Sequence, residues 1–367
     1  MSKSRILVFS LATCTLFFAL FMVPGSMSAL PGQVAHAAPA AQTVLADDAQ
    51  QAARARRTSS AIDVPPADRS SVRVVEITPD SHPWTTWNCA RLPIGVRQLG
   101  RNIELMVNGD ARLLIPAMSA SGARFVAPGD SGTEFWSKGG LANVRWSGTD
   151  LPVCAEGGAI TLPFRASGNE PFWGVDYDGW RLALSQPGVQ HHVDASIVQQ
   201  SADITVVQGT DDEFPLRVRI RRGLCADTMS GLVRPYTVAV TFQDQELTGC
   251  GGDAARLLQG ARWELVTLNG QALAGSPWLE FLPDGRLAGS NGCNLLNGRY
   301  TLTGEGVTIH DVATTRRACA PELMQQETRL NQRLADVRNF DFDDDGALRL
   351  SDGVNTLMAV EKPYVIP

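Results

Sequence analysis

Two short segments carry a serine and a lysine whose side chains suit the recognition of carboxylates. The first spans residues 119–122 (Ser-Ala-Ser-Gly), and the second spans residues 135–139 (Phe-Trp-Ser-Lys-Gly). The lysine, Lys138, is one of only three in a chain with 32 basic residues. Its ammonium group is a compact point charge that fits between two carboxylates, whereas a guanidinium is a wide planar fork. The two segments therefore predict recognition of an acidic site. An exposed surface lysine and a turn serine, Ser121, are the plainer alternatives.

The cysteines predict disulfide bonds rather than a metal site. Six of them follow the N-terminal segment, and none has the C-x-x-C spacing of a metal ligand pair. An even number in an exported chain indicates disulfides, and six cysteines allow 15 pairings. The simplest pairing is sequential and gives one bond to each of three sequence units: Cys89–Cys154, Cys225–Cys250 and Cys293–Cys319. Each of the two shorter loops would contribute roughly 3–4 kcal/mol in the chain-entropy model.

Three further patterns resemble catalytic or metal sites, and the sequence favours a structural interpretation of each. Residues 129–132 (Gly-Asp-Ser-Gly) are similar to the nucleophile segment of trypsin-like proteases, but no histidine stands in the context of a triad. The pair at 191–192 (His-His) lacks the H-E-x-x-H spacing, which favours a polar turn. Residues 341–352 formally match a calcium loop, but apolar residues at strand spacing on both sides favour a β-hairpin. We predict no enzymatic activity, no cofactor and no metal.

Composition excludes other function classes. Charged residues make up 19% of the 367 residues, hydrophobic residues make up 44%, and the net charge is −6. This balance allows buried cores and argues against a broad basic surface for nucleic acid. The length predicts two or three domains. The 34 glycines and 21 prolines suit many turns and short strands.

Residues 1–37 have the pattern of a secretory signal peptide. Two basic residues precede an apolar run at 6–23, and small residues follow up to an A-x-A site that ends at Ala37. Cleavage is expected after Ala37, with Ala29 as an alternative. The run also nearly reaches the length of a membrane anchor, so an uncleaved segment is the second interpretation. Cys14 lies inside the run and is interpreted as part of the signal rather than as a lipid attachment site.

The segment after the signal is predicted to be a disordered linker. Residues 38–70 are rich in alanine and hold no aromatic residue, so they cannot bury enough apolar surface to offset their ordering entropy. The folded part is therefore expected to begin between residues 71 and 84. Beyond the signal the chain has 30 basic and 38 acidic residues, a net charge of −8.

The predicted fold class is mainly β. Short runs rich in apolar residues, several with polar alternation, predict strands at Ile160–Phe164, Trp180–Leu184, Ile204–Val207, Leu216–Ile220 and Tyr236–Phe242. One helix is expected from Pro321 to about Val337, because proline suits the first turn and Leu323, Leu330, Leu334 and Val337 share one face. We expect a small antiparallel barrel followed by two further small β-rich domains, the last with one α-helix.

Residues 71–155 contain two motifs within one unit bounded by cysteines. The motifs are Ser-Ala-Ser-Gly-Ala-Arg-Phe at 119–125 and Glu-Phe-Trp-Ser-Lys-Gly at 134–139. This unit resembles the MliC-type inhibitors of C-type lysozyme, except that Phe125 replaces the usual tyrosine and Gly140 stands where an acid often follows. The resemblance implies a small β-barrel whose two loops enter the lysozyme cleft and meet its two catalytic carboxylates. The implied lysozyme-binding residues are Ser119, Ser121, Gly122 and Lys138.

The remaining chain resembles two other bacterial envelope domains. Residues 156–253 look like an uncharacterised domain through the segments 164–173 and 225–231, which implies no activity, and core packing is favoured for Trp173 and Trp180. Residues 254–362 are similar to the META (HslJ-like) family through segments that include Asn-Gly-Cys-Asn at 291–294. That resemblance implies stress or drug tolerance without catalytic residues.

The predicted function is inhibition of C-type lysozyme by an exported envelope protein located in the periplasm. Its predicted partner is the lysozyme, with no nucleic acid, and with membrane contact only through an uncleaved N-terminal segment. The alternative is a structural or stress-tolerance envelope protein whose first unit does not inhibit.

Overall fold

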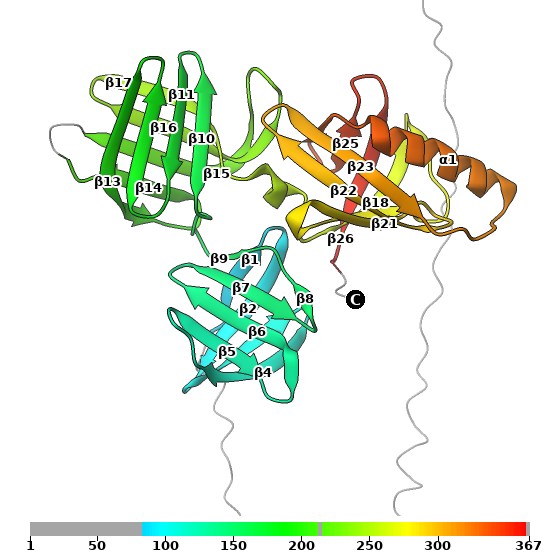
Figure 1. The fold of residues 1–367 in the computed structure, drawn as a ribbon, viewed down its shortest axis with the longest axis horizontal. Helices are drawn as coiled ribbons and strands as arrows, with labels where there is room; N and C mark the ends of the chain where they lie inside the picture. The colour runs from blue at the N-terminus through cyan, green and yellow to red at the C-terminus, as the bar shows by residue number, and fades with distance from the viewer. Residues whose placement is uncertain (1–82, 212–214, 365–367) are drawn as a thin grey trace, which may run out of the picture. The chain divides into compact units, whose positions relative to one another are not determined.

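The structure is a computed structural model and describes residues 83–211 and 215–364. These residues are mainly β, with three sheets and one α-helix among the elements described (Figure 1). The predicted fold class is thereby confirmed. The predicted signal peptide at 1–37 and linker at 38–70 lie outside the described residues. Within the described ranges, no helix combines the length and hydrophobicity that a membrane crossing requires.

The first sheet is a closed antiparallel barrel. Its strands follow the order β6-β5-β4-β3-β2-β1-β9-β7, and β6 also pairs with β7, which closes the ring. Inward positions alternate along each strand, as Ile103, Leu105 and Val107 show by being almost fully buried. The strands are β1 (Thr85–Cys89), β2 (Leu92–Leu99), β3 (Asn102–Val107), β4 (Asp110–Ala117), β5 (Ala123–Ala127), β6 (Asp130–Lys138), β7 (Leu141–Trp146), β8 (Thr149–Asp150) and β9 (Cys154–Glu156).

The second sheet is also a closed antiparallel barrel, in which each strand pairs with the next and β17 returns to β10. Its strands are β10 (Phe164–Asn169), β11 (Phe172–Tyr177), β12 (Arg181–Gln186), β13 (Val189–Gln200), β14 (Ile204–Gly209), β15 (Leu216–Ala226), β16 (Val233–Phe242) and β17 (Gln245–Gly251). In β15, Leu216, Val218 and Ile220 are buried while the arginines between them are exposed.

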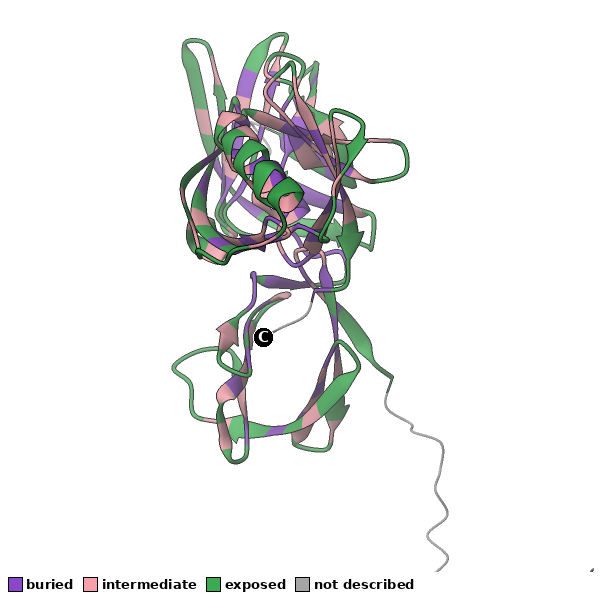
Figure 2. Ribbon diagram, turned by 90° about the vertical axis from the view of Figure 1, so that its right-hand side faces the viewer, coloured by how far each residue is buried: buried purple, intermediate pink, exposed green. Residues whose placement is uncertain are grey.

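The third sheet is open and packs against the helix. Its order is β23-β22-β21-β20-β18-β26-β25-β24, with β19 beside β18. The elements are η1 (Ala254–Leu257), β18 (Arg262–Leu268), β19 (Gln271–Ala272), β20 (Trp278–Leu282), η2 (Pro283–Gly285), β21 (Arg286–Ser290), β22 (Leu295–Thr303), β23 (Gly306–Thr314), α1 (Pro321–Asp336), β24 (Asn339–Phe342), β25 (Leu348–Ser351) and β26 (Thr356–Lys362). The predicted helix is confirmed, and Leu330 and Leu334 are buried on one face of α1 (Figure 2).

Two local predictions in the second barrel were wrong. The strand expected at Ile160–Phe164 begins only at Phe164, because Pro163 has no N–H to donate to a ladder and Ile160 instead packs into the barrel core. His191 and His192 lie within β13 rather than in a polar turn. Successive strand residues point to opposite faces, so these two rings do not converge on one ligand.

The tryptophan prediction holds for one residue and fails for the other. Trp173 is buried at 5% exposure and donates from Nε1 to the Thr248 carbonyl at 3.3 Å. Trp180 is 82% exposed, because it lies in the short turn between β11 and β12, where no core is within reach. The acidic segment at 341–352 does form the predicted hairpin, in which β24 pairs with β25.

The structure contains three disulfide bonds, and they are the three that sequential pairing predicts. Cys89 bonds Cys154, Cys225 bonds Cys250, and Cys293 bonds Cys319. Each bond links residues of a single sheet or its adjoining loops. The first bond joins two residues that also face each other in the ladder between β1 and β9.

Candidate functional site

The two predicted motifs meet at one end of the first barrel. The loop at 118–122 joins β4 to β5, and β6 ends at Lys138 before the turn into β7. Antiparallel pairing of β5 with β6 sets Ala123 opposite Ser137. The loop therefore arrives beside the end of β6, and the register brings segments 119–122 and 135–139 together.

Gly122 makes the closest approach between the two motifs. Its φ is +70°, and a Cβ at this position would lie 2.2 Å from the Ser137 carbonyl oxygen and 3.2 Å from the Lys138 Cβ. Any side chain would therefore collide with the β6 backbone while also straining φ. A glycine is required here for the serine loop to lie against the lysine strand.

Hydrogen bonds fix the loop while leaving its serine hydroxyl at 121 exposed. The Ser119 hydroxyl donates to the Gly122 carbonyl at 3.0 Å and closes the turn. The indole Nε1 of Trp136 donates to the Ser121 carbonyl at 2.9 Å. One bond lies within the loop and the other comes from the second motif, so both fix the loop backbone. The Ser121 side chain is therefore held on a rigid turn.

The Lys138 side chain is exposed and unpaired. Among the described residues it has neither a hydrogen-bond nor an ion-pair partner, and the same holds for the Ser121 hydroxyl. Exposed apolar groups flank the pair, since Met118 is 94% and Trp136 is 38% exposed. The arrangement offers an ammonium and a hydroxyl as hydrogen-bond donors on an amphipathic surface. Nothing in the sequence pattern marked Met118 as part of this surface.

The acid of the second motif, Glu134, is held in an ion pair of its own. Arg124 on β5 binds Glu134 on β6 through two bonds, Nε to Oε1 at 2.8 Å and Nη2 to Oε2 at 2.9 Å. The hydrogen bond from Arg124 holds the pKa of Glu134 below its ordinary value. Glu134 is thus charged and already paired. Sequence reasoning quoted this glutamate in a motif but missed its role, because the pairing depends on the strand register.

The departure at Phe125 leaves the barrel core intact. The Phe125 ring is partly buried and packs against the core of the first barrel, as expected for a residue that keeps the aromatic ring.

The Gly-Asp-Ser-Gly segment at 129–132 forms a tight turn. There the Asp130 carboxylate accepts from the Gly132 N–H at 2.8 Å and from the Thr133 hydroxyl. The hydrogen bond from Thr133 is the main reason that the pKa of Asp130 is lowered.

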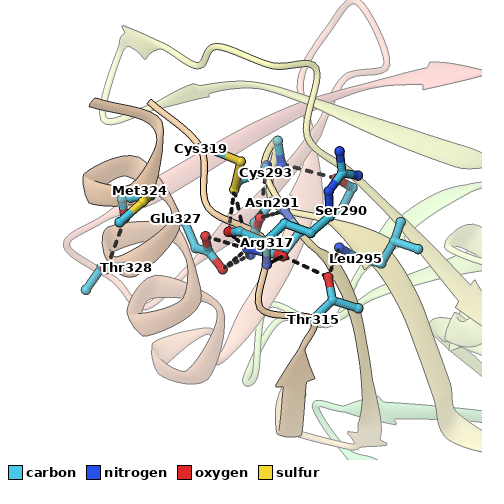
Figure 3. The surroundings of a disulfide bond; sticks show 12 residues. Ser290, Asn291, Cys293, Leu295, Thr315, Arg317, Cys319, Met324, Glu327 and Thr328 are labelled. Atoms are coloured by element: carbon cyan, nitrogen blue, oxygen red, sulfur yellow. Dashed lines mark hydrogen bonds between the residues drawn. A yellow bond between two sulfur atoms is a disulfide. The ribbon is translucent and has the colours of Figure 1, made fainter. Parts of the chain in front are cut away.

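The Asn-Gly-Cys-Asn segment of the third sheet builds structure. Asn291 and Asn294 are buried, and both side-chain amides donate to the Glu327 carboxylate of α1 at 3.0–3.1 Å (Figure 3). Gly292 has a φ of +94°, a left-handed backbone that favours glycine. The disulfide of Cys293 adds a covalent link beside this network. These polar groups face one another, so they present no open site.

The acidic hairpin uses its carboxylates in turns. Asp343 accepts from the N–H groups of Asp345 and Ala347, and Asp352 accepts from those of Val354 and Asn355. Across the ranges that the structure describes, no three histidine, cysteine or acidic side chains cluster as metal ligands would.

Two family models match the chain. The one described as membrane-bound lysozyme-inhibitor of c-type lysozyme matches residues 87–152, and the META domain model matches residues 256–364. Comparison with curated proteins and with solved structures found no match. Neither family match covers the second barrel. The chain therefore contains a domain of the MliC family of lysozyme inhibitors, which includes both Ser121 and Lys138, followed by a META domain.

Proposed function

We propose that this protein inhibits a C-type lysozyme by placing Ser121 and Lys138 between the two catalytic carboxylates of the enzyme. The observation that carries the proposal is the approach of Gly122 to the end of β6. It sets the braced loop that carries the exposed Ser121 against the end of β6, which carries the unpaired Lys138.

The chemistry of the target explains why these donors are suitable. Glycosidases hold a carboxyl pair on either side of the scissile bond, about 5–9.5 Å apart depending on mechanism. An ammonium with three donors bonds both carboxylates from the space between them. The serine hydroxyl supplies a further donor at the same place. Met118 and Trp136 would add apolar contact at the rim of the cleft. The net charge of −8 beyond residue 37 favours encounter with a basic lysozyme at low salt.

Titration calorimetry of purified variants against a C-type lysozyme tests the proposal. Lys138→Ala leaves buried carboxylates without their cation and should cost about 2–5 kcal/mol, or roughly 30- to 4,000-fold in Kd. Lys138→Arg should also weaken binding, because a planar fork does not replace a point charge in a narrow space. Ser121→Ala should cost less, about 1–2 kcal/mol. Arg101→Ala is the matched control, since it removes one exposed cation from the same barrel, in the turn between β2 and β3 and outside the two motifs.

If Lys138→Ala and Arg101→Ala lose affinity equally, Lys138 contributes only through the net charge of the protein, and the proposal is contradicted. Absence of binding by the wild type would favour the alternative, a structural or stress-tolerance protein that relies on its META domain.

We also propose that the protein acts in the periplasm after cleavage behind Ala37. The proposed organisation is a linker at 38–70, an inhibitor domain at 71–155, a second envelope domain at 156–253 and a META domain at 254–362. Three disulfide bonds support an oxidising compartment. Sequencing of the N-terminus in the periplasmic fraction should begin at Ala38. An intact signal, or a lipid on Cys14, in the membrane fraction would contradict this location.

A further inference from the structure

The second barrel carries a groove of about 920 Å³ on the outer face of its sheet. Cross-strand register defines its floor as two parallel rows of outward side chains. One row runs from Arg219 through Ala239 to Thr248. The other runs from Arg221 through Thr237 and Cys250 to Ser167. Small residues thus line the floor, and Arg219 and Arg221 of β15 stand along one side.

An arch of chain borders the groove and is held at two points. The segment 225–232, which comprises the end of β15 and the turn into β16, is tied to β17 by the disulfide Cys225–Cys250. Further along, the Asn169 amide donates to the Asp227 carboxylate at 3.2 Å and to the Thr228 hydroxyl at 2.9 Å. The arch therefore keeps its place over the sheet, and the groove is part of the fold.

The two arginines of the groove lack acidic partners. Among the residues that the structure describes, the Arg219 guanidinium has no hydrogen bond or ion pair, and the Arg221 guanidinium makes only a long bond of 3.4 Å to the Thr237 hydroxyl. Asp227, a partly buried acid in the lining of the groove, already accepts from the N–H groups of Met229 and Ser230. Glu170 lies at the rim and is exposed to solvent. The groove thus presents two free guanidinium groups beside hydroxyl groups.

Exposed apolar side chains complete the lining. Phe172, in the first position of β11, is 55% exposed, and Met229 on the arch is 72% exposed. Large apolar side chains at the edge of a groove are typical of contact with an apolar ligand part. The groove therefore combines a cationic side with an apolar rim.

We propose that this groove binds a phosphate-bearing amphiphile, with the phosphate on Arg219 and Arg221 and the alkyl part against Phe172 and Met229. Residues two apart on one strand face lie about 7 Å apart, so both guanidinium forks reach one head group. A phosphate monoester carries nearly two charges and three acceptor oxygens, which suits two arginines better than a single carboxylate does.

Titration calorimetry with decyl phosphate, below its micelle concentration and at 0.15 M salt, tests the proposal on the full chain. Inorganic phosphate tests the phosphate head group alone, and decyl maltoside tests the alkyl part alone. Each should bind at least about tenfold more weakly than decyl phosphate. Arg219→Ala and Arg221→Ala should each weaken binding of decyl phosphate about tenfold, as expected for a charged hydrogen bond. Arg217→Ala is the matched control, because Arg217 is exposed on the same face of β15 but outside the groove. It should change Kd less than threefold.

Further variants separate the two halves of the site from a folding defect. Phe172→Ser should lower the affinity for decyl phosphate about fivefold without changing the affinity for inorganic phosphate. Arg219→Lys keeps the charge but not the planar guanidinium, so its affinity for decyl phosphate should fall several-fold. Arg219→Ala and Arg221→Ala should still inhibit lysozyme. Equal binding by Arg219→Ala, Arg221→Ala and Arg217→Ala would overturn the proposal. Binding of inorganic phosphate or decyl maltoside as tight as that of decyl phosphate would also overturn it.

Discussion

Replacement of Gly122 by alanine should separate the geometry of the inhibitory loop from its charge. The new Cβ would lie 2.2 Å from the Ser137 carbonyl oxygen, whereas real Cβ contacts essentially never fall under 3.0 Å. The obstacle is backbone, so no flexible side chain can move aside. Either the loop or the end of β6 must shift by about 0.8 Å, the difference between these two distances.

The free energies follow from two effects. A left-handed φ costs alanine about 1–2 kcal/mol, partly offset by about 0.4–1 kcal/mol from the stiffer unfolded chain. Overpacking against fixed backbone adds about 1–3 kcal/mol. Gly122→Ala should therefore destabilise the first barrel by about 1–5 kcal/mol. A displacement near 0.8 Å also exceeds the tolerance of about 0.5 Å that a functional constellation allows, so Kd for lysozyme should rise at least about tenfold.

Gly109→Ala is the matched control for this substitution, because Gly109 lies in the turn between β3 and β4, outside the two motifs. Gly109 has a φ of +82°, but a Cβ there would meet nothing within 4 Å. It should carry only the conformational strain, with a change in Kd of less than about threefold. Calorimetric titration of both variants gives the Kd for lysozyme, and urea unfolding gives the free energy of unfolding. If the two alanine variants lose affinity equally, the close approach at Gly122 does not set the geometry of the site.

Other regions yield three further predictions. Backbone hydrogen bonds, first from Asn355, lower the pKa of Asp352 from 3.8 to about 2, so an NMR titration should give a midpoint near 2. Its stabilising contribution should be complete above pH 3.8 and be lost as the pH falls through 2, and a midpoint near 3.8 would refute this. Glu327→Ala should destabilise the META domain in urea by about 1–3 kcal/mol, because Asn291 and Asn294 lose their closest side-chain acceptor, whereas the exposed Gln332→Ala should change little. Trp180→Ser should leave the melting temperature unchanged, while Trp173→Ser should lower it, because only the second removes a core side chain.

Sequence patterns predict those features that depend on neighbouring residues. The helix at α1 was predictable because proline, acid and leucine positions all agree within one segment. The strands at β15 and β16 were predictable because apolar side chains alternate along them. The loop at 119–122 and Lys138 were recognisable through their motifs. The disulfides followed from the order of the cysteines along the chain.

Features that depend on contacts between distant residues could not be predicted from the sequence. Trp180 is exposed because a short turn carries it away from the core, and its aromatic character gave the opposite prediction. The pairing of Arg124 with Glu134 needs the register of β5 on β6. The groove of the second barrel needs four strands side by side, so the alternating arginines of β15 predicted a strand but not a binding surface.

The ladder that closes the first barrel bears on how such a chain matures. Cys89 lies on the first strand, and its partner Cys154 lies on the last, directly opposite in the same ladder. Oxidation of this pair therefore awaits the whole unit and marks completion of the ring. In a chain that crosses a membrane from its N-terminus, each native partner is also the next cysteine to emerge, for Cys225 and Cys293 as well. Delivery in that order would present Cys89, Cys225 and Cys293 each with its native partner first, which would reduce the need for disulfide isomerisation.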